Sequence, residues 1–298
     1  MGDVATNVAV GAEINRDGHG MVDVVAAGRG WRVALLTDTL ELSFRPEHQR
    51  GRSWLDLRGQ AGAAGLAISP WTRGEPDVAR AQLAFTAALQ GGSIAYGPGG
   101  TWVGLTGGVT RWAFAPKSEA TGEVSEDRTV GQAAGVFGVH RSGVSGWGRV
   151  GVDVQLAAAS PFAHGQATWS PDEWLLAPYL QIHAGTAENA DVATATRLGG
   201  LNPYVVPLAG AAWAEFWVED YAAVRAGPAL NLGDWTLAPV GDVATFDADA
   251  AYGLALTARW EHGRWDIDGA VGVAPDLDRP DGVTAGAAYF RLAYGPIR

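Results

Sequence analysis

The chain has 298 residues, a formal net charge of −11 at neutral pH and no cysteine. This length fits one large domain or two small ones. The lack of cysteine excludes disulfides and thiolate metal sites, and an acidic chain without a basic run argues against nucleic-acid binding. Glycine (42) and tryptophan (13) are abundant, which favours a β protein with many turns and aromatic anchors over a helical protein.

Strict alternation of apolar with small or polar residues predicts strands along almost the whole chain, and no segment is predicted to be helical. The first strand places Val8, Val10, Ala12 and Ile14 on one side. The predicted strands are 8–14, 20–28, 31–45, 52–68, 78–91, 101–116, 129–141, 146–157, 174–185, 190–198, 210–232, 234–246, 250–261, 264–275 and 283–294.

The length of these strands indicates whether the protein lies in water or in a membrane. Soluble strands usually run about 5–6 residues, whereas many strands here are about as long as the 9–11 residues that cross a bilayer in a barrel. So many long strands without covering helices would leave open edges, which closure into a barrel removes. We therefore predict an all-β fold: a transmembrane antiparallel up-and-down β-barrel, with residues 1–298 as a single domain. A soluble β protein is the alternative.

Connection lengths predict the topology of this barrel. Short connections at 142–145, 233–234 and 262–263 alternate with long ones over most of the chain, as in outer-membrane barrels with tight periplasmic turns and longer outer loops. The long ones are 69–78, 116–128, 158–173, 199–209 and 275–282. If both termini are periplasmic the strand number is even, and we predict about 14 strands, with 12–16 allowed.

Tryptophan positions favour the same reading. Six of them lie at predicted strand ends, where outer-membrane barrels carry an aromatic girdle: Trp31, Trp54, Trp71, Trp169, Trp174 and Trp235. The expected location is therefore the bacterial outer membrane. No signal-peptide pattern occurs in the sequence, and we expect an exported protein whose signal has been replaced by a start methionine.

Two hairpins can be assigned a register. A turn at His262–Gly263 would pair Arg259 with Asp266, Glu261 with Arg264, and Trp260 with Trp265, which gives one charged and one apolar face. A turn at Gly233–Asp234 pairs Leu232 with Trp235 and Leu230 with Leu237.

The segment Thr196–Gly210, "TRLGGLNPYVVPLAG", leads from a strand into a long loop, and five predicted strands follow it. Arg197, Gly199 and Gly200 in this position, with the rhythm of the closing strands, resemble the last part of the outer-membrane surface-antigen superfamily. That superfamily includes barrel-assembly and two-partner-secretion translocators, whose long loop opens with a glycine pair before the final five strands. The likeness covers roughly residues 190–298.

The resemblance implies a translocation-related barrel, and this chain departs from the family pattern in three respects. The Arg-Gly-aromatic motif of the family's loop is missing, and no arginine lies near Val205 and Val206. No periplasmic substrate-binding repeats are recognisable, and the chain is short for the family's sixteen strands.

A second motif predicts a different activity. His140 and Ser142 alternate on one strand and so share a face, and a neutral histidine can activate a serine hydroxyl for acyl transfer. The pair looks like that of the outer-membrane phospholipase A and the lipid A deacylase. No third partner is in place to orient the imidazole, so a histidine and a serine that merely flank a turn are the alternative.

Charged residues on the predicted inner face form the third candidate site: Arg259, Glu261, Arg264, Asp266 and Asp268. Rings of charge in a lumen set the selectivity of a pore, and the acidic chain would favour cations. The alternative is a solvated or plugged interior with internal salt bridges. The six histidines are scattered without ligand spacing, so we expect neither a metal nor a cofactor.

These observations predict an outer-membrane pore or translocation-related channel that is not an enzyme. The alternatives are a lipid hydrolase that uses His140 and Ser142, and a structural or adhesive barrel with a plugged lumen. The expected partners are outer-membrane lipid and, during insertion, the barrel-assembly machinery. Nucleic acid is not expected, and no protein partner is indicated.

Overall fold

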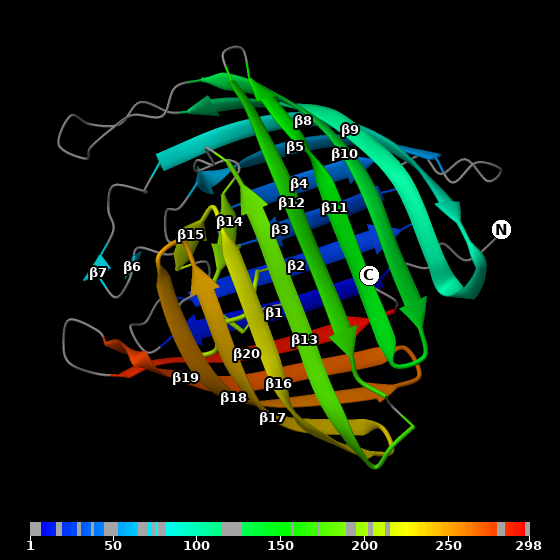
Figure 1. Ribbon diagram of the computed structural model, residues 1–298, viewed down its shortest axis with the longest axis vertical. Helices are drawn as coiled ribbons and strands as arrows, with labels where there is room; N and C mark the ends of the chain where they lie inside the picture. Colours follow the sequence, from blue (N-terminus) through cyan, green and yellow to red (C-terminus); the bar gives the residue numbers. More distant parts are fainter. Residues whose placement is uncertain are drawn as a thin grey trace.

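Antiparallel strands make up most of the described chain in this computed structural model (Figure 1). The structure describes residues 7–15, 20–28, 31–36, 39–44, 53–64, 71–72, 75–76, 82–114, 127–155, 158–171, 173–188, 195–201, 205–211, 215–278 and 284–295. One short 3-10 helix, η2 (Pro98–Gly100), occurs among these residues. No helix in these ranges has the length and apolar character needed to cross a membrane.

Within the described residues, sixteen strands form one closed barrel, in which each strand pairs with the next barrel strand along the chain. They are β1 (Asn7–Asn15), β2 (Gly20–Gly28), β3 (Trp31–Leu36), β4 (Thr39–Phe44), β5 (Ser53–Ala64), β8 (Gln82–Tyr96), β9 (Thr101–Phe114), β10 (Arg128–Arg141), β11 (Val144–Gln155), β12 (Ala158–Trp169), β13 (Leu176–Ala187), β16 (Tyr221–Leu232), β17 (Trp235–Phe246), β18 (Asp249–His262), β19 (Trp265–Asp278) and β20 (Thr284–Tyr294). Two small hairpins lie outside this sheet: β6 (Trp71–Thr72) with β7 (Glu75–Pro76), and β14 (Thr196–Leu198) with β15 (Phe216–Val218).

The first and last strands close the barrel. β1 pairs with β20 from Val8 opposite Tyr294 to Asn15 opposite Ala287, so no open edge is left at this seam. The predicted antiparallel up-and-down barrel is therefore confirmed. Its sixteen strands reach the upper limit of the predicted range of 12–16 and exceed the central value of 14 by two.

Side chains alternate between a large apolar outer face and a small or polar inner face. On β18, Leu254 and Leu256 point outward and are more than half exposed, whereas Ala251 and Ala255 point inward and are buried. Val103 and Leu105 on β9 repeat the outward pattern, with 60% and 71% exposure. An apolar outer band of this kind is the surface that a barrel presents to lipid.

Predicted segments were wrong in three regions of the chain, in ways that the barrel explains. Residues 31–45 form two antiparallel strands, β3 and β4, rather than one. Residues 158–173, predicted as a long loop, contain β12, which pairs along its length with β11. Its outward positions carry alanine, glycine and Pro161 instead of branched apolar residues, so its alternation is weak.

The third region is the connection that precedes the last five barrel strands. Residues 190–198 were predicted to be a barrel strand and 210–232 one long strand. Among the residues of this segment that the structure describes, the only strands before β16 are the short β14 and β15, and β16 begins at Tyr221. Five barrel strands, β16 to β20, follow this loop, as predicted.

The tight turns gather at the rim that also carries the two chain ends. The turns at 142–143, 233–234 and 263–264 lie at this rim, and Figure 1 places the N- and C-termini on the same side. The opposite rim has the long connections 115–127 and 188–220. It also has short ones at 156–157 and 247–248, so the predicted alternation of short and long connections is incomplete.

Aromatic side chains form an outward belt at the tight-turn rim. Trp169, Trp174 and Trp235 are 42–54% exposed there, and Trp265 packs against Tyr294 with ring centroids 4.8 Å apart. This matches the predicted girdle. The side chains of the other three predicted girdle residues, Trp31, Trp54 and Trp71, lie outside those that the structure describes.

The β18–β19 hairpin has a different register from the predicted one. His262 faces Trp265, Trp260 faces Ile267 and Arg259 faces Asp268, so the turn residues are Gly263 and Arg264. A two-residue hairpin turn needs a positive φ at its first position, which Gly263 adopts at +62° and which a histidine would occupy with strain. The Gly233–Asp234 hairpin has the predicted register, with Leu232 opposite Trp235.

Candidate functional site

The connection between β13 and β16 folds into the barrel. Figure 1 shows β14 and β15 within the ring of strands, and Leu198 and Leu208 of this connection are fully buried. We refer to its described residues, 195–201, 205–211 and 215–220, as the inward loop. Its apolar side chains and the wall form one cluster: Leu198, Val206, Leu208, Ala211, Phe216 and Val218 from the loop, with Tyr221, Ala223, Ala244, Phe246 and Ala251 from the wall.

Two buried wall carboxylates hold the inward loop by its backbone. Glu13 of β1 accepts a hydrogen bond from the Leu201 N–H, with both oxygens 3.2 Å from the nitrogen. Asp242 of β17 accepts one from the Ala209 N–H at 2.7 Å. Both carboxylates are at most 3% exposed. Because a buried carboxylate is unfavourable unless it is hydrogen-bonded or paired, these contacts fix where the loop lies.

The counter-ion of Asp242 comes from the barrel wall. Arg225 of β16 faces Asp242 across the strand pair, and its Nε and Nη2 atoms each donate to one carboxylate oxygen at 2.7 Å. This parallel two-bond geometry is the strong form of an arginine–carboxylate pair. Because Arg225 supplies the positive charge from the wall, the loop can dock on Asp242 through a backbone N–H, without an arginine of its own near its tip.

Small residues on the inner wall let the loop approach closely. A Cβ atom on Gly253 would lie 2.3 Å from the Ala209 carbonyl oxygen, and one on Gly272 would lie 2.8 Å from the Ala209 Cβ. Gly210 lies directly against the backbone of Val273 and Ala274, with a positive φ of +84°. The abundance of alanine and glycine on the inner faces of β16 to β20 therefore has a structural cause: the wall makes room for the loop.

The three residues of the predicted loop motif lie where the chain enters the lumen. Gly199 and Gly200 are buried and have φ values of +119° and +101°, a region that side-chain-bearing residues rarely adopt. Their N–H groups donate to the carbonyls of Val206 and Leu208, so they join the two arms of the loop. Arg197 stacks on Trp217, with its guanidinium carbon 4.9 Å from the ring centroid.

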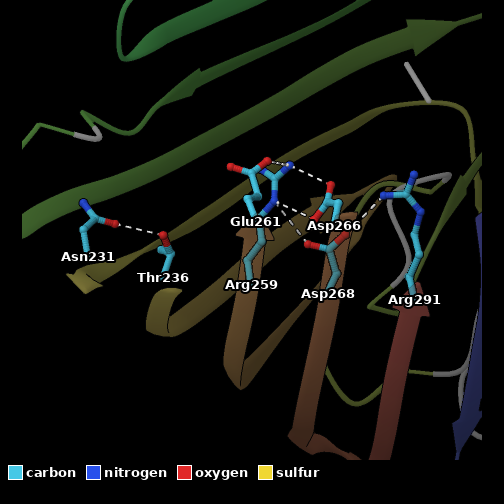
Figure 2. Close-up of polar contacts among 7 residues, drawn as sticks. All are labelled: Asn231, Thr236, Arg259, Glu261, Asp266, Asp268 and Arg291. Atoms are coloured by element: carbon cyan, nitrogen blue, oxygen red, sulfur yellow. Dashed lines mark hydrogen bonds and ion pairs between the residues drawn. The ribbon is translucent and has the colours of Figure 1, made fainter. Parts of the chain in front are cut away.

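The predicted lumen charges lie on the inner faces of β18 and β19 towards the tight-turn rim (Figure 2). Arg259 is at the centre and pairs with Glu261, with Asp266 at 2.9 Å and with Asp268 at 3.4 Å. Arg291 of β20, which the sequence interpretation missed, pairs with Asp268 at 3.1 Å. We call these five residues the rim cluster. It holds three carboxylates and two guanidinium groups and so has a formal charge of −1.

Arg264 does not belong to the rim cluster, contrary to prediction. It is the second turn residue of the β18–β19 hairpin, and its guanidinium carbon lies 4.6 Å above the ring of Tyr294, an outward-facing residue. The register shift that moves Arg264 into the turn also removes its predicted pairing with Glu261.

His140 and Ser142 are exposed at the tight-turn rim. His140 points to the inner face and faces Ser145, while Ser142 is in the two-residue turn before β11. Within the described ranges no hydrogen bond joins the two side chains, and no carboxylate hydrogen-bonds to the His140 ring. This arrangement lacks the oriented nucleophile and base of a hydrolase. In the same ranges no cluster of three or more potential metal ligands occurs.

Comparison with known proteins places this geometry in a class. No protein-family model and no curated protein matches the sequence. Among solved structures, CdiB from Acinetobacter baumannii is similar with a TM-score of 0.65 at 12% identity, over 99% of this chain and 60% of that one. BamA from Haemophilus ducreyi lacking POTRA domains 1-3 is similar with a TM-score of 0.68 at 7% identity, over 98% of this chain and 70% of that one.

The fold is that of an outer-membrane β-barrel. The resemblance that the segment around Arg197, Gly199 and Gly200 predicted is confirmed as a likeness of fold to CdiB and BamA. The chain spans 60% of the length of the CdiB chain it matches.

Proposed function

We propose that residues 1–298 act as a single outer-membrane barrel domain that forms a pore or translocation-related channel and is not an enzyme. The observation that supports this most is the inward loop. It occupies part of the lumen and is held there by two backbone hydrogen bonds, to Glu13 and Asp242, that can be removed one at a time. A loop of this kind narrows the lumen and restricts the passage of solutes without closing the lumen completely.

In this proposal the tight-turn rim faces the periplasm, as in other outer-membrane barrels with short periplasmic turns. The aromatic belt then lies at the periplasmic interface between the outer membrane and water. Outer-membrane lipid surrounds the barrel, and the barrel-assembly machinery acts during insertion. The rim cluster then lies at the periplasmic mouth, and its formal charge of −1 gives a weak preference for cations.

Planar-bilayer recording of the refolded full chain tests the proposal. The wild type should conduct weakly. A variant with 199–211 replaced by a short Gly-Ser linker should show larger single-channel steps, because the lumen loses part of its contents. Channels missing from both proteins, each inserted and folded, would rule out the pore.

A structural or adhesive barrel with a plugged lumen is the second candidate, and the apolar cluster around Leu198, Leu208 and Phe246 favours it. This cluster buries apolar side chains of the loop against the wall, with Phe216 and Phe246 ring centroids 4.6 Å apart. For such a barrel the loop-replaced variant would stay non-conducting, and deletion of the outer connections, such as 115–127, would abolish partner binding.

A further inference from the structure

The outer face of the barrel carries an apolar groove at the seam where the first and last strands meet. Val8 and Val10 of β1 line one side, Leu292 and Tyr294 of β20 the middle, and Trp265 of β19 the other side. The groove has a volume of about 540 Å³. All five residues point away from the lumen, and Trp265, at 46% exposure, stands as a ridge along it.

A cation lies at the rim end of this groove. Arg264 covers the Tyr294 ring at 4.6 Å. Gly295 lies beside it: a Cβ at that position would lie 2.0 Å from the Asn7 Oδ1 atom and 3.2 Å from the Arg264 Nη2 atom. Among the residues that the structure describes, Arg264 forms no ion pair with a carboxylate. By contrast Arg111, an outward residue of β9, is paired with Asp127 at 3.3 Å.

We propose that this seam groove binds one phospholipid, with an acyl chain along Val8, Val10 and Leu292 and the phosphate on Arg264. This apolar groove ends, at the level of the aromatic belt, in a cation that has no carboxylate partner among the described residues. That is the charge and polarity order of a phospholipid, chain first and phosphate last. Because the acyl chain is already in an apolar surrounding, its contact with the groove adds van der Waals packing, and the arginine supplies the selection for the anionic headgroup. This proposal rests on the part of the proposed function that places the barrel in a membrane, and it does not require the barrel to conduct ions.

Native mass spectrometry of the detergent-purified full chain tests the site with three probes. These are phosphatidylglycerol, a diacylglycerol with the same chains, and glycerol phosphate. The wild type should retain one phosphatidylglycerol. Arg264→Gln should bind it about five-fold more weakly and bind diacylglycerol as the wild type does. Val10→Trp, which fills the groove from a lipid-facing position, should lose both lipids, and glycerol phosphate should not bind to any form.

Two matched controls separate this site from general lipid contact. Arg111→Gln removes an outward arginine elsewhere, and Val150→Trp enlarges an outward residue of β11 that is 55% exposed; both should bind like the wild type. Arg264→Lys keeps the charge and should restore affinity for phosphatidylglycerol. Equal affinity in Arg264→Gln and the wild type, or lipid retention by Val10→Trp, would overturn the site.

Heat-modifiable migration on gels confirms that each variant is folded before its lipid is measured. These lipid measurements need only a folded barrel in detergent, so their outcome does not depend on whether the protein conducts. Conduction without lipid retention would refute the lipid site and leave the proposed pore standing. A protein that folds in buffer without detergent would lose both proposals.

Discussion

Arg225 and Asp242 face each other on the inner wall and join through two hydrogen bonds of 2.7 Å each, with both side chains at most 9% exposed. The same carboxylate accepts the Ala209 N–H of the inward loop. Asp242 thus connects two neighbouring strands and a loop that lies between them and the lumen. The loop docks on an ion pair that the wall has already completed.

Removal of one partner of this pair should destabilise the barrel strongly. Arg225→Met leaves the Asp242 carboxylate buried without its cation, and we expect a loss of about 3–5 kcal/mol in the free energy of unfolding. The double change Arg225→Met with Asp242→Leu should cost less than the single one, because no uncompensated charge remains. Urea unfolding in lipid vesicles, followed by tryptophan fluorescence, measures both; a double variant less stable than Arg225→Met would contradict the assignment.

Gly253 should be sensitive to the smallest possible enlargement. A Cβ there would lie 2.3 Å from the Ala209 carbonyl oxygen, so Gly253→Ala must displace the loop or the strand. The expected loss is about 1–3 kcal/mol, with faster hydrogen exchange at the Ala209 N–H. Gly269→Ala on β19 is the matched control, since its nearest atom would be 3.9 Å away, and it should change stability by no more than about 0.5 kcal/mol.

The rim cluster predicts a change in ion selectivity. Arg259 pairs with three carboxylates, and its removal changes the formal charge of the rim cluster from −1 to −2. Arg259→Gln should therefore move the reversal potential in a KCl gradient further towards cations. Stability should change by less than about 1 kcal/mol, because exposed ion pairs contribute little. Arg111→Gln on the outer face should leave selectivity unchanged, and an equal shift in both variants would show that the effect is not local.

Disulfide trapping can check the register of the β18–β19 hairpin, because the chain has no cysteine of its own. Thr257 faces Ala270 in the structure, and directly paired residues lie within disulfide range. Thr257→Cys with Ala270→Cys should therefore oxidise readily in the folded barrel. Thr257→Cys with Asp268→Cys, which the predicted register would have paired, should stay reduced; the reverse result would restore the predicted turn.

The hydrolase alternative has a direct test. Since no hydrogen bond joins His140 and Ser142 in the described chain, Ser142→Ala should leave any phospholipid hydrolysis by purified protein unchanged. Hydrolysis by the wild type that this substitution abolishes would mean that the turn rearranges around substrate.

The barrel could be predicted from the sequence because its signals are local. Alternation and strand length depend only on neighbouring residues, and so does the Gly233–Asp234 turn. β12 was missed because its outward positions carry alanine, glycine and Pro161. The predicted register of the β18–β19 hairpin is wrong by two residues because it places Gly263 second in the turn, after His262, whereas Gly263 is the first turn residue. Charge matching could not reveal this, since Arg259 faces an aspartate in either register.

The site was harder to predict because its contacts join distant parts of the chain. The bond from Leu201 to Glu13 spans 188 residues, and nothing near either residue in sequence announces the other. The glycine pair at Gly199 and Gly200 marked where the loop enters but not that it turns inward. The signal that could have revealed this was the run of alanine and glycine on the inner positions of the last five strands, which a large lumen filled only by water would not require.

Because Arg225 belongs to the wall, Asp242 does not depend on the loop for its counter-ion. When the loop is cut out, Asp242 keeps its cation and loses a single neutral donor. The shell therefore has the properties of a reusable scaffold. Foreign segments of similar length, joined between Ala187 and Tyr221, could be hosted in the lumen if they present a backbone N–H to Asp242 and small side chains to Gly253 and Gly272.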